Sequence, residues 1–124
     1  MGRNEEPAIN DICRISAGTE IKGTFISKSD IRIDGSFEGD LTTTGKLVLG
    51  EKAVVKGNII CRGADIFGNV SGELCAQDIV NFKSSSIFTG NLKTGKICIE
   101  LGTKFNGNCK IITNEEFKQF QNKQ

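Results

Sequence analysis

The sequence predicts an all-β fold, a single-stranded, right-handed parallel β-helix (a solenoid) of about six triangular coils. Three observations predict it. An apolar frame recurs every 16 to 18 residues, the apolar residues within each copy are spaced two apart, and every copy has one glycine at the same position. A repeat this short cannot bury its own apolar side, so its copies must stack on one another.

The frame reads Φ-x-Φ-(x3 or x5)-Φ-x-Gly-x-Φ, where Φ is an apolar residue. Every Φ position in the six copies is apolar, although hydrophobic residues make up only 37% of the chain. Such agreement indicates one structural unit used repeatedly along the chain. The copies consist of Cys13, Ile15, Ile21, Gly23, Phe25; Ile31, Ile33, Phe37, Gly39, Leu41; Leu47, Leu49, Val55, Gly57, Ile59; Ala64, Ile66, Val70, Gly72, Leu74; Val80, Phe82, Phe88, Gly90, Leu92; and Ile97, Ile99, Phe105, Gly107, Cys109.

Each copy is expected to form three short strands, because a spacing of two places alternate side chains on one face of a strand. The first strand carries Φ-x-Φ, the second carries Φ-x-Gly, and the third begins at the apolar residue after the glycine. Two residues after that apolar residue, a further side chain of the third strand should point toward the axis, and the residues at this position are mostly small. These residues are Ser27, Thr43, Cys61, Ala76, Thr94 and Ile111.

The glycine column should mark a bend that needs positive φ or leaves no room for a Cβ atom. The spacer before it sets the first corner, which should be tight in coils two and four and looser in coils one, three and five. The sixth copy keeps the longer spacer. The right hand follows from the crossover preference of parallel strands.

The solenoid is expected over residues 13–112, with a flexible N-terminal arm at 1–12 and a short tail at 113–124. The arm holds the only proline, Pro7. The tail either forms one short helix that caps the last coil, with Asn114 as its N-cap, or is a frayed end.

Composition favours a soluble cytoplasmic protein. The net charge of +1 gives no patch for nucleic acid or an anionic membrane surface, and no apolar run approaches 18 residues. No signal peptide is recognisable. Five cysteines, an odd number with no CxxC pair, indicate a reducing compartment and thiols used for packing.

No catalytic, cofactor-binding or metal-binding residue is predicted. The chain has no histidine, which excludes Ser-His and Cys-His pairs and histidine-based zinc sites. Asp30, Asp34, Glu38 and Asp40 could face a polysaccharide, but no long inserted loop builds a cleft around them. We interpret them as solvated acids on an outer face.

The two ends of the solenoid are the candidate functional surfaces, because an uncapped end exposes apolar core and unpaired backbone groups. Joining two ends would bury on the order of 400 Å² of apolar surface, worth about 10 kcal/mol. About ten backbone bonds at roughly 1 kcal/mol each add to this, against an association cost of about 4 to 15 kcal/mol. Both polar head-to-tail and two-fold joining are open. The predicted interface comprises Cys13, Ile15, Ile21 and Phe25 in the first coil, and Ile97, Ile99, Phe105, Cys109 and Ile111 in the last.

Five segments resemble the bactofilin family: GTEIKGTF (18–25), DIRIDGSFEGDL (30–41), KLVLGEKAVVKGNI (46–59), ADIFGNVSGEL (64–74) and KICIELGTKFNGNC (96–109). The likeness covers roughly residues 11–112, in order. It implies a bacterial cytoskeletal protein that polymerises without nucleotide and acts as a scaffold for cell-wall enzymes at the inner face of the cytoplasmic membrane. The absence of GxxxxGK[ST] agrees with this implication.

Many bactofilins are expected to touch membrane through a short apolar N-terminal tail. Residues 1–10 here carry Arg3, Glu5 and Glu6, which argues against direct membrane contact or for contact through a partner. The leading hypothesis is therefore a self-assembling filament whose partner is itself, with cell-wall-modifying or membrane proteins as further partners. The alternative is a non-polymerising binding module for a wall polymer or a wall-remodelling protein.

Overall fold

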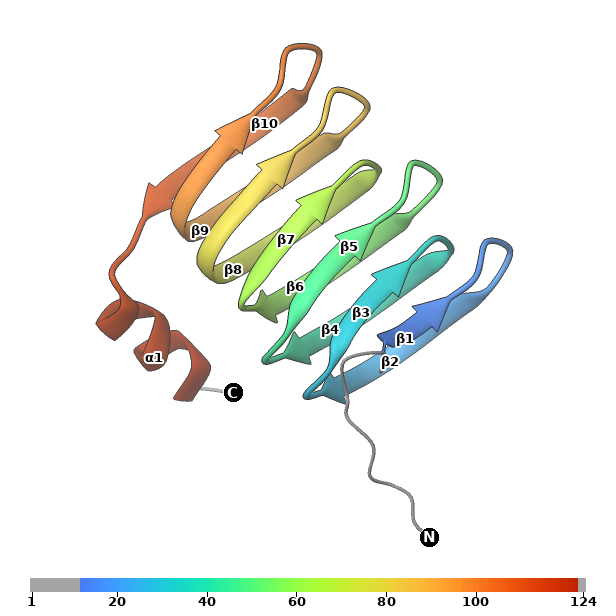
Figure 1. Cartoon of the computed structure of the whole chain (residues 1–124), viewed down its shortest axis with the longest axis horizontal. Coiled ribbons are helices and arrows are strands. Elements are labelled where there is room, and N and C mark those ends of the chain that lie inside the picture. Colours follow the sequence, from blue (N-terminus) through green and yellow to red (C-terminus); the bar gives the residue numbers. More distant parts are fainter. Residues whose placement is uncertain (1–11, 123–124) are drawn as a thin grey trace, which may run out of the picture.

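The computed structural model describes residues 12–122, which form ten strands and one helix. All strand pairs are parallel, and successive coils lie side by side along one axis (Figure 1). The predicted solenoid is confirmed. The elements are β1 (Ile12–Ile15), β2 (Glu20–Ser27), β3 (Asp30–Ile33), β4 (Ser36–Thr43), β5 (Lys46–Leu49), β6 (Val54–Cys61), β7 (Gly63–Ile66), β8 (Asn69–Phe82), β9 (Ile87–Ile99), β10 (Lys104–Ile111) and α1 (Asn114–Asn122).

The prediction of three separate strands in each coil is wrong in one respect. The second and third sides belong to one continuous strand, such as β4, which bends at its central Gly39 and keeps its hydrogen bonds on both sides of the bend. β8 and β9 extend further and run into the first side of the next coil. The ladders therefore remain intact through the glycine bends.

The core is the column of Φ residues inside the solenoid. In coils two to five every Φ side chain is buried, which confirms the frame for the interior coils. The inward residues of the third side are buried as predicted in coils two to five, two of them threonines, whereas Ser27 in the first coil is half-buried and Ile111 in the last is exposed. Thr43 donates its hydroxyl to the carbonyl of Ser29 at 2.7 Å, and Thr94 donates to corner carbonyls. Their polar atoms are thus satisfied without water.

The glycine column has φ values between +124° and +142°. From Gly39 onward, a Cβ atom would overlap the carbonyl oxygen of the column glycine in the preceding coil. Both predicted reasons for glycine therefore hold at once, because the backbones of successive coils approach too closely for a side chain. At Gly23, where no coil precedes, only the positive φ remains.

Helix α1 corrects the expectation for the tail. It neither caps the last coil nor frays, but folds back along the flank, where Phe117 and Ile112 pack on Ile60 and Cys75 (Figure 1). Ile60 and Cys75 are register neighbours on the outer face of the third side. The helix therefore covers part of a lateral face.

The N-cap of α1 is Thr113, one residue before the predicted Asn114. The hydroxyl of Thr113 accepts the N–H of Glu116 at 3.2 Å, and the Glu116 carboxylate accepts the N–H of Thr113 at 3.1 Å. This reciprocal pair is a capping box, which fixes the start of the helix.

The N-terminal arm predicted at 1–12 lies, except for Ile12, outside the described residues, and Ile12 begins β1. No helix within residues 12–122 is long and apolar enough to cross a bilayer.

Candidate polymer interface

The C-terminal end of the solenoid presents an apolar layer with solvent on its outer side. Phe105 stacks on Phe88 with 5.1 Å between ring centroids and meets Phe82 edge-on at 5.6 Å, and both of these partners are buried. Beside this stack, Ile99 is 49% exposed and Ile111 is 57% exposed. The same positions one coil earlier are buried, so this exposure results from the lack of a following coil.

Of the other predicted residues at this end, Ile97 is half-buried and Cys109 is exposed. The structure therefore brings all five predicted C-terminal residues into the last coil. Ile112, the next residue after β10, turns away from the end layer and joins the cluster under α1.

The N-terminal end is the counterpart. Cys13, Ile21 and Phe25 are half-buried against the core, and Ile15 is buried. Phe25 meets Phe37 of the second coil edge-on, with 6.4 Å between centroids. This layer is less exposed than the C-terminal one.

Both end coils also leave backbone groups available. Among residues 12–122, β1 and β2 pair only with β3 and β4, and β10 pairs only with β9. Each end is therefore an open edge of a parallel ladder. Because α1 lies on the flank, it covers neither edge (Figure 1).

Two strongly exposed apolar residues near the ends are absent from the predicted set. Leu101, at the first corner of the last coil, is 95% exposed, and Ile26, on the outer face of β2, is 76% exposed. Leu101 lies in the spacer of the sixth copy and Ile26 follows the last Φ residue of the first copy, so a search for inward residues passes over them. For Leu101 the available signal is a large apolar residue where the interior turns carry Glu51 and Ser84. Ile26 offers no such signal, because its register equivalents in coils three and four are Ile60 and Cys75.

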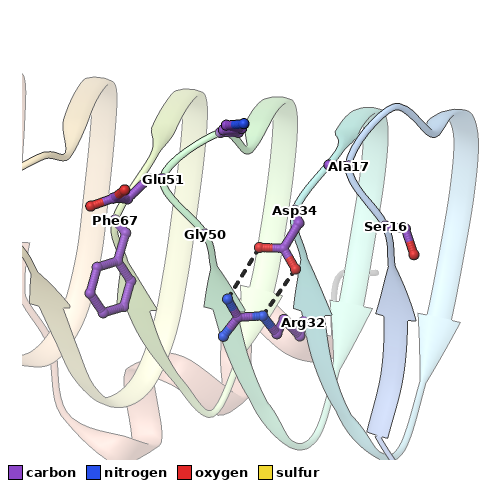
Figure 2. Close-up of a pocket in the computed structure, with 8 residues that line it drawn as sticks. Ser16, Ala17, Arg32, Asp34, Gly50, Glu51 and Phe67 are labelled. Carbon is purple, nitrogen blue, oxygen red and sulfur yellow. Dashed lines mark hydrogen bonds and ion pairs between the residues drawn. The ribbon is translucent and has the colours of Figure 1, made fainter.

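A shallow groove of about 570 Å³ runs along the first-corner edge near the N-terminal half (Figure 2). Arg32 and Asp34 form a two-pronged ion pair on its floor, with nitrogen–oxygen distances of 3.0 and 3.2 Å. Phe67 lies on its wall. The groove forms because the tight corner of coil two lies between two looser ones.

The four acids considered for polysaccharide chemistry do not converge. Asp34 pairs with Arg32, Asp30 accepts the backbone N–H of Lys46, and Asp40 accepts from Asn58. Glu38 and Asp40 flank the bend of β4. In the described part of the chain, no group of three or more potential ligands could hold a metal ion.

All five cysteines lie within the described residues and are unpaired. Cys61 is fully buried, which raises the pKa of its thiol well above the usual range, and the neighbouring Cys75 acts in the same direction. Cys98 and Cys109 are exposed. The expectation that thiols serve as packing groups therefore holds for Cys61, Cys13 and Cys75, whereas Cys98 is exposed on the outside of the solenoid.

Comparisons with known proteins agree with this architecture. Residues 13–110 match the family described as "Bactofilin: Polymer-forming cytoskeletal". Bactofilin BacO of Myxococcus xanthus (strain DK1622) is 29% identical over 101 residues, which are 82% of this chain and 80% of BacO. Bactofilin BacP of the same organism is 28% identical over 87 residues, 70% of this chain and 36% of BacP.

One solved structure is also similar, a cryo-EM reconstruction of Thermus thermophilus bactofilin double helical filaments. Its TM-score is 0.75 at 31% identity, over 78% of this chain and 96% of that chain. On the family match and this structural likeness, the chain belongs to the bactofilin family of polymer-forming cytoskeletal proteins.

Proposed function

We propose that this chain polymerises end to end, without nucleotide, through the apolar layers of its first and last coils. One observation carries the proposal: every Φ side chain in coils two to five is buried, whereas the last coil leaves Ile99 and Ile111 about half exposed. Stacking another coil on this layer removes that surface from water and pairs the open backbone edge. The T. thermophilus relative forms filaments, which supports the same behaviour here.

The filament acts as a non-enzymatic scaffold. Its support is membership of a family of polymer-forming cytoskeletal proteins. We place it in the bacterial cytoplasm, because unpaired cysteines suit a reducing compartment. By likeness to the family, its role is to organise cell-wall and cell-shape machinery near the inner face of the membrane. Recruited wall-modifying or membrane proteins would be its further partners.

Electron microscopy of the purified protein in nucleotide-free buffer tests the assembly. We expect filaments whose abundance is unchanged when ATP or GTP is added. Monodisperse particles at tens of micromolar protein would instead support the non-polymerising binding module. A fluorescent fusion in the source organism, scored with cell shape after deletion of the protein, tests the cellular role separately.

A further inference from the structure

The first corners of the four looser coils are equivalent four-residue turns that differ in a systematic way. Each closes with a bond from the fourth N–H to the first carbonyl: Thr19 to Ser16, Ala53 to Gly50, Ser86 to Lys83 and Thr103 to Glu100. By ladder register and spacing, the second residues of these turns occupy equivalent tips. The tip residues are Ala17, Glu51, Ser84 and Leu101, and all of them are exposed.

The two terminal turns differ from the two interior ones at the tip and at the residue after it. The interior tips are polar, Glu51 and Ser84, whereas the terminal tips are apolar, Ala17 and Leu101. After the tip, the terminal turns have a glycine with positive φ, +88° at Gly18 and +97° at Gly102. No residue other than glycine has positive φ in the described chain, so the interior turns have a different backbone.

Leu101 is the extreme case. At 95% exposure it touches almost nothing in its own chain, so packing within the subunit does not explain a leucine there. It lies two residues after Ile99, which is itself half exposed in the end layer. The apolar surface of the C-terminal end therefore continues outward from the core layer onto the turn.

We propose that the turn Glu100–Thr103 is part of the subunit junction and that Leu101 packs against a second copy of this chain. The inference rests on the proposed function, because the second copy is the one that stacks on the last coil. Leu101 continues the apolar surface of the end layer, so the copy that stacks on that layer is the one that would cover it. The corresponding tips of the interior coils, which face no junction, are polar. Leu101 then determines how tightly, rather than whether, subunits join.

Leu101→Asp tests the proposal, with Ser84→Asp as the matched control at the same turn position of an interior coil. We expect Leu101→Asp to raise the critical concentration for filament formation on the order of ten- to a hundred-fold, the range for burying one leucine. Leu101→Ala should raise it less, and Ser84→Asp should leave it near the wild-type value. Sedimentation gives the critical concentration, and circular dichroism checks the fold.

The outcomes separate this inference from the proposed function. If wild-type protein forms no filaments, the proposed function fails and this inference fails with it. If wild-type protein forms filaments and both Leu101 variants assemble at the wild-type concentration, only the inference is overturned. An equal effect of Ser84→Asp also overturns it, because the cause would then be charge on the corner edge in general.

Discussion

Phe105→Arg probes the C-terminal layer most directly. In the isolated subunit the Phe105 ring has one side on Phe82 and Phe88 and the other side toward solvent. The substitution removes two aromatic contacts worth about 0.5–1.5 kcal/mol each beyond their buried area. Because the ring is only half-buried, the total loss of folding stability should not exceed the roughly 3–5 kcal/mol of a core Phe→Ala change. Because domains of this kind have about 5–15 kcal/mol, and because arginine can extend into water at the open end, the subunit should stay folded.

The cost to assembly is larger. In a joined filament the guanidinium would lie between two apolar layers without a partner, and an uncompensated buried charge costs about 3–5 kcal/mol. At 1.4 kcal/mol for each factor of ten, the critical concentration should rise between about 100-fold and several thousand-fold. A joint in which two last coils meet would contain the charge twice, so its loss would be greater still.

Sedimentation and electron microscopy over a concentration series measure this rise. Asn106→Arg is the matched control, because it adds the same charge to the neighbouring, outward-facing residue of β10. We expect long filaments from the control and short, folded oligomers from Phe105→Arg. If Phe105→Arg forms long filaments at the wild-type concentration, the last coil is not the interface, and the reasoning from its exposed layer is wrong.

Three further predictions follow from the same structure. Gly57→Ala should lower the free energy of unfolding by about 1–3 kcal/mol through backbone strain, and further through a clash with the preceding coil, whereas Gly23→Ala should cause the strain alone. Urea unfolding measures both losses, and equal losses would contradict the close approach of the backbones at Gly57. Assembly should slow the alkylation of Cys109 in the end layer and leave the outward-facing Cys98 reactive, and mass spectrometry measures both rates. Equal protection of the two thiols, or protection of neither, would count against the proposed interface. Phe117→Ser should release α1 and raise amide exchange there without changing the critical concentration, and a changed critical concentration would connect the helix to the joint.

Most of the fold follows from the sequence because one signal is repeated in every coil. Each Φ residue of an interior coil is surrounded by equivalents from both neighbouring coils, so periodicity alone identifies the core. The glycine column is predictable for the same reason, since a close backbone approach must recur wherever the coils repeat. The apolar character of the end layers follows as well, because the first and last copies keep the frame without polar substitution.

The features that the sequence did not reveal do not depend on the inward-facing Φ and glycine positions of the repeat. The position of α1 depends on Ile60 and Cys75, two outward residues on different coils that become a patch only after the coils stack. The continuity of the second and third sides depends on backbone hydrogen bonds through the glycine bend, and no side-chain pattern reports these. Leu101 sits at a turn position, where frame matching assigns no meaning to apolar character.

The reversal of the chain after β10 has a practical result for anyone who attaches something to this protein. Because α1 packs on the third and fourth coils through Phe117, a fluorescent protein or an affinity handle joined beyond α1 would start on the flank, away from the terminal layer. Bulky cargo could then decorate the sides of a growing fibre while its tips stay free to elongate. Had the helix covered the final coil, the same attachment would have blocked growth.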